Sequence, residues 1–558
     1  MNNRYPSREN KDAVDQLRTG WSRVPEVLQA MGYKELRQGQ QPVVCNILAG
    51  KDTLCVLPTG TGKTACFVVP TLALNWKTIV FSPLVALMRD QVQSLNRLRI
   101  PAMALSSMQS DTENAYAAEQ WALGKLSFLY VAPERLHNQK FKDAMDQTPP
   151  DMVVLDEAHT LSQWSENFRS SYCKVGDFIA DKKPQVVAAF TATCPAEVEA
   201  DVRRVLGIPN ANKVVFFPRR TNLHLESREL ENMVQIADAL RHEITGPAIV
   251  YCSTVNRTEE TAATLSSLMG EEVVHFHGQL TDSEKRTNMD LFMSDRVRIV
   301  CATNAFGMGV DKPNVRGVIH RDIPGCIEAL SQEIGRAGRD GNDSLCLTFY
   351  SDESLKTQKF FIECGNPSPQ EIRQVFSTLK KAADRAGNVE MTIGEIGQRS
   401  GVFKWKVTTI MEILKANSVI ERVDNKQKLF RVRRAIQGAT SDSRFNLWWD
   451  IIDNIGVKSA DGFLEVDMAS FVQQTGLSEP TVRNWLKKWQ DAEVIRYVPP
   501  FSGAPTKILG SLNLIDFSRL EGKLELSYEK LNKVLEYIDT PDADKHEFLE
   551  NYFAHTPE

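Results

Sequence analysis

The sequence predicts an α/β protein with two consecutive parallel-sheet domains, followed by a mainly helical part. Short β-branched runs alternate with helical stretches from residue 52 to residue 215, and the alternation restarts at residue 248 and continues to residue 350. This pattern is typical of parallel sheets covered by helices on both faces. After about residue 367 the strand-like runs become rare and helical periodicity takes over.

Ten short apolar runs are the expected strands. In the first domain they cover residues 53–57, 78–82, 128–132, 152–156 and 186–191. In the second domain they cover residues 248–252, 272–277, 297–302, 317–321 and 344–350. Two such sheets placed back to back form a cleft that can hold a nucleotide.

Length and composition limit the possible classes of protein. The 558 residues correspond to three or four domains, and the formal charge of -5 means that any nucleic-acid contact must come from local basic patches. No apolar run reaches the roughly 18 residues of a membrane span, and the polar start is no signal peptide. Ten scattered cysteines without a C-x-x-C pair favour reduced thiols and a cytoplasmic location.

A phosphate-binding loop follows the first expected strand. It matches G-x-x-x-x-G-K-[ST], with Pro58 in place of the first glycine. Glycines let successive N–H groups point at phosphate oxygens, the lysine reaches the β- and γ-phosphates, and the threonine hydroxyl ligates Mg²⁺. An ordinary glycine turn is the alternative. The expected nucleotide contacts are Pro58, Thr59, Gly60, Thr61, Gly62, Lys63 and Thr64.

An acidic box, Asp-Glu-Ala-His, ends the expected strand at residues 152–156. We expect Asp156 to hold Mg²⁺, directly or through water, and Glu157 to orient or deprotonate the attacking water. A carboxylate pair that only caps a helix is the alternative. Together with the phosphate loop, and in this order, the acidic box indicates hydrolysis of a nucleoside triphosphate.

Two arginines three residues apart, Arg336 and Arg339, lie in the run 332–341. On a helix they would share one face and project across the cleft. An arginine finger stabilises charge in phosphoryl transfer and is worth roughly 10³–10⁵ in rate. An arginine finger from the opposite domain would make hydrolysis depend on closure of the two domains. Hydrolysis could then drive movement of the protein along a strand. Surface ion pairs are the alternative.

The C-terminal third predicts two DNA-binding modules of the winged-helix kind. Residues 391–434 read as helix, turn, helix and a wing of two strands, 419–423 and 429–432, and residues 463–509 repeat this plan. Residues 390–434 contain five acids and ten bases, which favours a surface that faces phosphates. A solvated wing is the alternative. Residues 516–553 read as a pair of helices.

Further motifs follow in the order of superfamily 2 helicases. They are the runs 82–92, 132–136, 190–193, 302–313 and 332–341. With Gly32–Gln40 upstream of the phosphate loop and the aromatic run Leu161–Arg169 after the acidic box, the chain resembles the RecQ family of DNA helicases over about residues 20–350. The resemblance implies two RecA-like domains. Thr160, Leu36 and Arg321 depart from the family pattern, but none of these departures removes a catalytic group.

The resemblance also implies roles for individual residues. Tyr33 would stack on adenine, Gln40 would hydrogen-bond its edge, and Arg37 would help to hold the nucleotide. The implied nucleotide contacts of the second domain are Gly309 and Asp311. The residues implied to sense single-stranded DNA or couple it to hydrolysis are His159, Trp164, Phe168, Arg169, Thr191 and Thr193. Aromatic residues at this spacing can also be simple core.

The accessory part resembles the winged segment and the helical hairpin of RecQ-like proteins. In the family the hairpin carries zinc cysteines, but here Asp544-Lys545-His546 stands where a cysteine is expected, and no cysteine follows Cys364. We therefore expect no zinc and a hairpin that rests on packing alone. The expected domains are residues 1–215, 216–365, 366–436, 437–515 and 516–558.

These features predict an ATP- and Mg²⁺-dependent DNA helicase that moves 3′→5′ on single-stranded DNA, with the polarity implied by the family alone. We expect a monomer that acts on single-stranded and forked DNA in repair, recombination or replication, with single-strand-binding protein among its partners. An RNA helicase and a DNA-binding adaptor with a silent ATP site are the alternatives. Candidate strand-separating aromatics are Phe501 and three tryptophans expected mainly as core, Trp405, Trp485 and Trp489.

Overall fold

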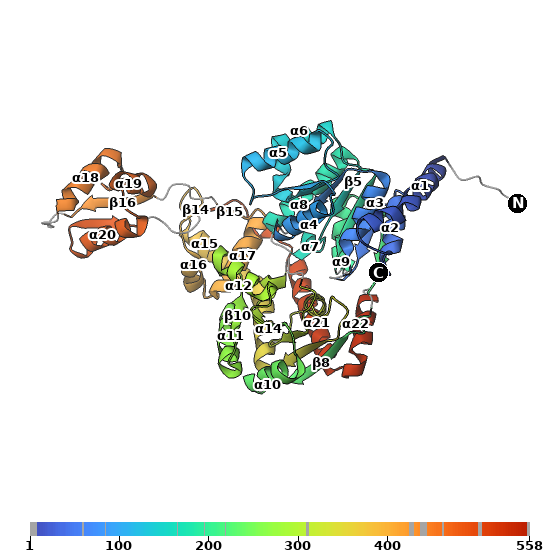
Figure 1. The fold of residues 1–558 in the computed structure, drawn as a ribbon. Helices are drawn as coiled ribbons and strands as arrows, with labels where there is room; N and C mark the ends of the chain where they lie inside the picture. Colours follow the sequence, from blue (N-terminus) through green and yellow to red (C-terminus); the bar gives the residue numbers. More distant parts are fainter. Residues whose placement is uncertain are drawn as a thin grey trace. The chain divides into compact units, whose positions relative to one another are not determined.

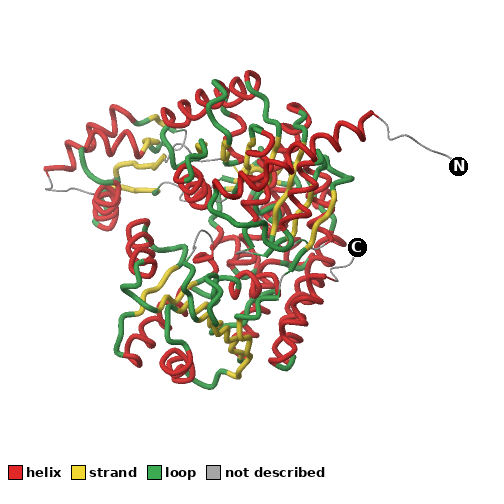
Figure 2. Tube along the Cα trace, turned by 45° about the vertical axis from the view of Figure 1, so that its right-hand side comes forward, coloured by secondary structure: helices red, strands yellow, loops and turns green. Residues whose placement is uncertain are grey.

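The computed structural model describes twelve stretches of the chain, which form two compact units. One unit comprises Met1–Phe360 with Ser527–Glu558, and the other comprises Phe361–Leu526. Ribbon and tube views show the elements of each unit (Figures 1 and 2). The described stretches are residues 8–58, 61–83, 85–163, 166–192, 194, 196–217, 219–307, 312–422, 429–435, 443–459, 462–499 and 505–554.

The first domain is built on a parallel sheet in the order β3-β4-β2-β5-β6-β1-β7. All five expected strands are present, and the two strands at the sheet edges, β3 and β7, were not predicted. The five inner strands are buried along their whole length, as expected for a sheet covered on both faces. The strands are β1 (Thr53–Val56), β2 (Thr78–Phe81), β3 (Ala102–Leu105), β4 (Phe128–Val131), β5 (Met152–Leu155), β6 (Val186–Thr191) and β7 (Asn212–Val215).

Helices cover both faces of this sheet. Neighbouring residues of one strand belong to different core clusters, Leu54 to one and Cys55 to the other, because successive side chains point to opposite faces. The helices are α1 (Arg8–Ala30), α2 (Gln40–Leu48), α3 (Lys63–Leu74), α4 (Val85–Arg97), α5 (Asp111–Ala122), α6 (Gln139–Gln147), α7 (Thr160–Gln163), α8 (Glu166–Lys182) and α9 (Ala196–Leu206).

The second domain has a parallel sheet in the order β10-β11-β9-β12-β13-β8. The five predicted strands are present, and β8, which pairs with β13, was not predicted. The strands are β8 (Leu223–Glu229), β9 (Ala248–Tyr251), β10 (Val273–Phe276), β11 (Ile299–Ala302), β12 (Gly317–His320) and β13 (Ser344–Tyr350). Its helices are α10 (Met233–Asp238), α11 (Val255–Met269), α12 (Asp282–Met293), α13 (Ile327–Ile334) and α14 (Asp352–Gly365).

The C-terminal hairpin, from Ser527 onward, belongs to the same unit as the second domain. It consists of α21 (Phe517–Asp539) and α22 (Lys545–Ala554), and α22 contacts β8 (Figure 1). The His546 Nε2 atom lies 2.8 Å from the Leu223 carbonyl oxygen, and the Phe217 and Phe553 rings stack with centroids 4.4 Å apart. The hairpin is therefore docked on the sheet edge.

A buried lysine joins the two helices of the hairpin. The Lys545 ammonium group donates to the carbonyl oxygens of Tyr537 (2.8 Å), Ile538 (3.3 Å) and Thr540 (2.8 Å), and its side chain is fully buried. A cation is favourable at a helix C-terminus. The expectation that the hairpin rests on packing alone was therefore wrong, because Lys545 satisfies the last carbonyls of α21.

The second unit contains two modules, and one interrupts the other. Its first module has α15 (Pro369–Ala382), α16 (Ile393–Ser400) and α17 (Lys404–Ala416) with the antiparallel sheet β14-β20-β15. These strands are β14 (Asn388–Val389), β15 (Ile420–Arg422) and β20 (Thr506–Ile508), and Arg422 pairs with Thr506. The predicted wing, in which residues 419–423 and 429–432 form two strands of one module, was wrong. β15 pairs with β20, and the strand that begins at residue 429 pairs with strands of the other module.

The inserted module occupies the chain between β15 and β20. Its sheet has the order β17-β18-β16-β19, formed by Val457–Lys458, Leu464–Asp467, Leu429–Arg434 and Ile495–Val498 respectively. It is packed against α18 (Ser443–Ile455), α19 (Met468–Thr475) and α20 (Glu479–Asp491). The predicted division at residues 436 and 437 would separate β16 from the strands with which it pairs.

The arginines of β16 contact aromatic rings. The Arg431 and Arg433 guanidinium groups lie 4.9 and 4.7 Å from the centre of the Phe463 ring, and Arg434 lies 4.7 Å from that of Trp449. These three charges therefore stabilise the inserted module through cation–π contacts.

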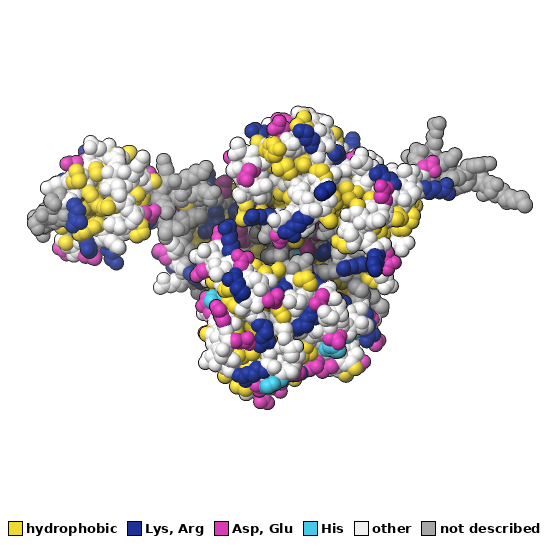
Figure 3. Space-filling view, viewed as in Figure 1, with side chains coloured by type: hydrophobic (Ala, Val, Ile, Leu, Met, Phe, Trp, Pro, Cys, Tyr) yellow, Lys and Arg dark blue, Asp and Glu magenta, His cyan; other side chains and the backbone are white. Residues whose placement is uncertain are grey.

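Basic and acidic side chains are interspersed on the face in Figure 3. Among the described helices, none is both long and apolar enough to cross a bilayer.

Candidate active site

The phosphate loop connects β1 to α3. Gly62 has φ 81° and caps α3, and a Cβ atom at this position would lie only 2.7 Å from Gln40 Nε2. The Thr61 hydroxyl donates to the Pro58 carbonyl oxygen (2.7 Å), which tightens the turn. Thr64 lies half-buried in the first turn of α3, where free N–H groups favour an anion. Two predicted contacts, Thr59 and Gly60, lie outside the described residues.

The Gln40 side chain is hydrogen-bonded to the backbone of the phosphate loop. Its side-chain amide donates to the carbonyl oxygens of Thr61 (2.9 Å) and Gly62 (3.1 Å), and its Oε1 atom accepts from the Arg37 amide (2.7 Å). Both ends of this buried side chain are thus engaged by backbone groups. A hydrogen bond to adenine remains a prediction, and it would require Gln40 to exchange these partners. Tyr33 is half exposed, as a base-stacking residue must be.

The acidic box lies directly after β5. Asp156 and Glu157 are only 4% and 7% exposed, and Glu157 adopts φ 51°, in the left-handed region. The Lys63 ammonium group lies 3.5 Å from Glu157 Oε1, so the loop lysine and the expected catalytic base meet. Gln91 Nε2 donates to Asp156 Oδ2 at 3.4 Å, a contact that the sequence motif did not identify.

Electrostatics make the acidic pair unequal. Burial and, to a smaller extent, the charge of Glu157 raise the pKa of Asp156 to about 6, although the charge of Lys63 opposes both effects. Burial also raises the pKa of Glu157, but the charges of Lys63, His159 and Arg336 outweigh it, so that this pKa lies below its usual value. Glu157 is therefore the carboxylate that remains ionised. Among the described residues, its Oε2 atom has no hydrogen-bond partner.

His159 connects the acidic box to the end of β6. Its Nδ1 atom lies 3.1 Å from the Thr191 hydroxyl oxygen and 3.3 Å from Glu157 Oε2. Burial lowers the pKa of His159, although the charge of Glu157 partly opposes this effect. The structure thus brings together three of the predicted residues, and a neutral imidazole can bridge the carboxylate and the hydroxyl.

The two motif arginines are not on a helix, contrary to the prediction. Helix α13 ends at Ile334, and residues 335–340 form turns. Arg336 is 3% exposed, its Nε atom has no hydrogen-bond partner among the described residues, and its charge lowers the pKa of Glu157. Arg336, in the second domain, is therefore close enough to the acidic box for its charge to act on Glu157. Arg339 is half-buried, and its Nε atom donates to the Gly335 carbonyl oxygen at 3.4 Å.

Arg220 supports the turn that contains Arg336, and the sequence did not reveal it. Its guanidinium group donates to the carbonyl oxygens of Gly335 (3.3 Å), Ala337 (2.9 Å) and Gly338 (2.5 Å), which flank Arg336. Burial lowers its pKa, and the charges of Arg339 and Arg37 lower it further, so three cations lie close together. Arg220 positions the arginine turn. It belongs to no contiguous motif, so no sequence pattern singled it out.

Other predicted residues are not described by the structure. Thr193, Gly309, Asp311 and Trp164 lie outside the described residues. Phe168 and Arg169 lie on α8, but their side chains are outside the description. The proposed DNA contacts of this aromatic segment therefore stay predictions.

The site fits a magnesium-bound nucleoside triphosphate. The glycine turn, the free amides of α3 and Lys63 provide positive groups for phosphates. Asp156 and Thr64 provide oxygen ligands of the kind that Mg²⁺ prefers. Within the described part of the chain, buried Arg336 Nε and Glu157 Oε2 have no hydrogen-bond partner; a phosphate group could accept from the Arg336 guanidinium, and the attacking water could donate to Glu157.

The fold and the site define a nucleotide-driven motor of the helicase class. Two family models match the chain: DEAD/DEAH box helicase over residues 37–201, and helicase conserved C-terminal domain over residues 228–341. A solved structure of S. cerevisiae dbp5, bound to gle1 and ip6, is similar with a TM-score of 0.50. It is 21% identical and covers 62% of this chain and 92% of that chain, which shows the fold alone.

Curated relatives give the family. The probable ATP-dependent DNA helicase RecS of Bacillus subtilis is 34% identical over 64% of this chain and 72% of that protein. The ATP-dependent DNA helicase RecQ of Synechocystis is 33% identical over 67% of this chain and 79% of that protein. The chain belongs to the RecQ family. It spans 60% and 56% of the RecQ helicases of Bacillus subtilis and Haemophilus influenzae.

Proposed function

We propose that this protein is an ATP-dependent DNA helicase that moves on single-stranded DNA and separates duplex or forked DNA. The carrying observation is that Arg336 comes from the second domain, while its charge lowers the pKa of Glu157 in the first domain. This arrangement supports hydrolysis that requires both domains.

Each residue of the site has a role in hydrolysis. Lys63 and the amides of α3 would hold the phosphates, while Asp156 and Thr64 would hold Mg²⁺, which neutralises phosphate charge. Glu157, ionised and next to Lys63, would orient the attacking water. Arg336 would stabilise the charge that develops on the transferred phosphoryl group. Arg220 keeps the Arg336 turn in place.

Coupling to DNA would pass through Thr191 and His159. The resemblance to the family implies that the segment after the acidic box responds to single-stranded DNA, and His159, which precedes this segment, contacts both Thr191 and Glu157. A shift of His159 would therefore change the environment of the expected catalytic base. The polarity of movement, 3′→5′, is taken from the family.

The first module of the second unit provides a further DNA-contacting surface. Trp405, expected mainly as core, is 65% exposed at the start of α17, and Phe403 before it is 53% exposed. Trp489 is buried, as predicted, whereas Trp485 stacks under Arg444 with a 3.7 Å separation, and Phe501 lies outside the described residues. Base–aromatic stacking is worth about 1–3 kcal/mol, enough to offset about one base-pair step. We therefore favour Trp405 as the strand-separating residue.

An unwinding assay tests the proposal. Full-length protein should hydrolyse ATP faster with single-stranded DNA than with RNA of equal length, and it should unwind a duplex with a 3′ tail. Stronger stimulation by RNA would favour the RNA helicase. No hydrolysis with single-stranded DNA would favour the silent adaptor and overturn the proposal.

The cellular setting follows from the same proposal. DNA repair, recombination or replication would supply the forked substrates, with single-strand-binding protein as a partner and a monomer as the active form. The described cysteines are all free, which favours a reducing compartment such as the cytoplasm.

A further inference from the structure

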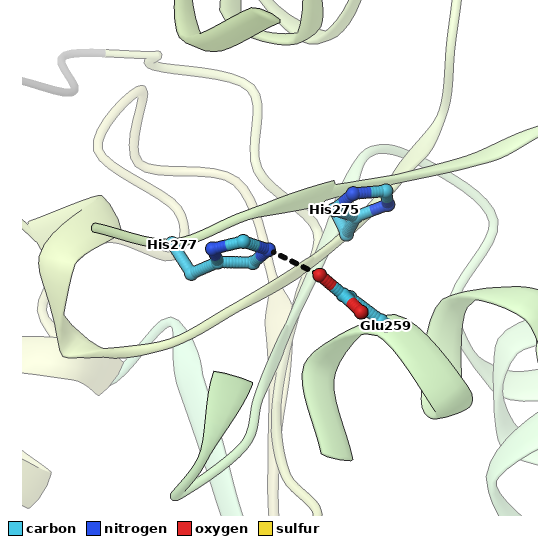
Figure 4. A group of neighbouring side chains, drawn as sticks. All are labelled: Glu259, His275 and His277. Atoms are coloured by element: carbon cyan, nitrogen blue, oxygen red, sulfur yellow. Dashed lines mark ion pairs between the residues drawn. The ribbon is translucent and has the colours of Figure 1, made fainter. Parts of the chain in front are cut away.

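Two histidines and a glutamate converge at the edge of the second sheet. His275 lies on β10 and His277 follows this strand, so both project to the same side (Figure 4). Glu259 on α11 points toward them, and one ligand atom from each residue lies within 4.8 Å of the other two. The two imidazole rings are nearly parallel, with centroids 5.5 Å apart.

His277 is buried without hydrogen bonds. It is 2% exposed, and within the described part of the chain neither ring nitrogen has a hydrogen-bond partner. Its Nε2 atom lies 3.0 Å from Glu259 Oε1, but the contact does not have hydrogen-bond geometry. A buried polar group without a partner is costly, so such a group in a native structure calls for an explanation.

We propose that Glu259, His275 and His277 bind a divalent cation of the zinc class. Two imidazole nitrogens and one carboxylate form a donor set that suits Zn²⁺, whereas Mg²⁺ prefers oxygen ligands only. Three protein ligands leave the fourth tetrahedral position for water. The bound cation would satisfy a ring nitrogen of His277.

The geometry needs only small side-chain movements. Bonds of about 2.0–2.1 Å place tetrahedral ligand atoms about 3.3 Å apart, closer than the present 4.8 Å limit. His277 is fixed by burial, but the Glu259 side chain is 51% exposed and His275 is half-buried, so both can turn toward it. Glu284 adds negative charge: Thr281 lowers its pKa most, and the two histidines also lower it.

The cation would join α11 to the edge strand β10 of the second domain. Glu259 belongs to α11, His275 belongs to β10 and His277 follows it directly, while Asn288 of α12 already holds β10 by donating to the His275 carbonyl oxygen at 2.8 Å. β10 pairs with β11 alone among the described strands, so a metal bridge would strengthen its otherwise one-sided attachment. The expectation of no zinc rested on the missing cysteines of the C-terminal hairpin and did not consider this site.

Metal titration of the full chain tests the inference. Protein stripped with EDTA and freed of chelator is titrated with Zn²⁺ in an excess of Mg²⁺, by calorimetry and by thermal unfolding. We expect one tight site and a higher melting temperature. Glu259→Ala and His275→Ala, both at accessible positions, should each weaken this binding by more than the roughly 10–100-fold typical of an outer-shell partner.

Two results would overturn the inference. One is the absence of a tight Zn²⁺ site in the folded wild-type protein. The other is equal Zn²⁺ affinity in the wild-type protein and both variants, which would place the metal on cysteines or elsewhere. His224→Ala is the matched control, because this exposed histidine lies in the same domain and should leave Zn²⁺ binding unchanged.

Discussion

The Nδ1 atom of His159 lies 3.1 Å from the hydroxyl oxygen of Thr191 and joins the acidic box to the end of the neighbouring strand. β5 and β6 are adjacent and parallel, so their carboxyl ends meet at one edge of the sheet. His159 also lies 3.3 Å from Glu157. A displacement of either strand end would therefore move His159 relative to the Glu157 carboxylate, which lies next to Lys63.

Thr191→Val removes this hydroxyl with little change in shape. We expect basal ATP hydrolysis to persist, while its stimulation by single-stranded DNA falls about fivefold, since one hydrogen bond contributes about 1 kcal/mol. The measurement is the ratio of hydrolysis rates with and without DNA. Thr53→Val is the control, because Thr53 is buried on β1 in the same sheet but bonds to the Lys51 carbonyl. Unchanged stimulation would contradict the coupling role.

Arg336→Ala should lower the rate of ATP hydrolysis by about 10³-fold or more, as expected for loss of an arginine finger. Nucleotide binding, measured with a fluorescent ATP analogue, should change much less, because the first domain provides the phosphate loop. Arg241→Ala, at an exposed position of the same domain, is the control. Near-normal hydrolysis by Arg336→Ala would show that this charge does not act on the phosphates.

Lys63→Ala should reduce ATP hydrolysis about 10²–10³-fold, the range found when one stabilising donor is removed from a transition state. Binding of single-stranded DNA should persist, because it uses other surfaces. Filter binding and a coupled hydrolysis assay measure the two properties. Lys51→Ala is the control at an exposed position before β1. Loss of DNA binding together with hydrolysis would indicate misfolding and make the comparison of hydrolysis rates invalid.

Lys545→Met should destabilise the C-terminal hairpin by about 2–3 kcal/mol, because three carbonyl oxygens at the end of α21 lose a charged donor. Hydrogen exchange over residues 517–554 should accelerate, while the core strands of the first domain stay protected. Lys533→Met, with a side chain that is 49% exposed, is the control. Equal exchange in both variants would show that the buried ammonium group contributes little.

Excision of the inserted module tests the strand pairing of the second unit. Replacement of residues 423–505 by a short Gly/Ser linker should leave the first module folded, because Arg422 and Thr506 already pair. The matched variant lacks residues 437–505 instead, which leaves β16 without its partners β18 and β19, and we expect it to aggregate. Circular dichroism and size-exclusion chromatography compare the two. Aggregation of the first variant alone would contradict the insertion.

The inner strands and the phosphate loop could be predicted because their signals are local. Central parallel strands are buried on both faces and read as continuous apolar runs. The edge strands β7 and β8 contain charged residues, such as Lys213 on β7 and Arg228 on β8, so their sequences do not show this pattern. The sequence motif identified Arg336 and Arg339, but it did not predict the turn that contains them. Arg220 hydrogen-bonds to this turn from a distant segment of the chain.

The accessory part was harder to predict because strand pairing is not local. The strand at residues 429–434 follows β15 closely in sequence, which suggested a hairpin, but it pairs with β18 and β19. Alternation alone does not identify the partner of a strand. The charge count over residues 390–434 likewise could not show that Arg431, Arg433 and Arg434 contact aromatic rings.

The ammonium group of Lys545 gives the C-terminal hairpin a chemistry unlike that of a thiolate–zinc cluster. Peroxides convert metal-bound thiolates to sulfenic acids or disulfides and so release their metal, whereas an ammonium group has no sulfur to oxidise. Oxidative stress would therefore leave this attachment of α22 to the end of α21 intact.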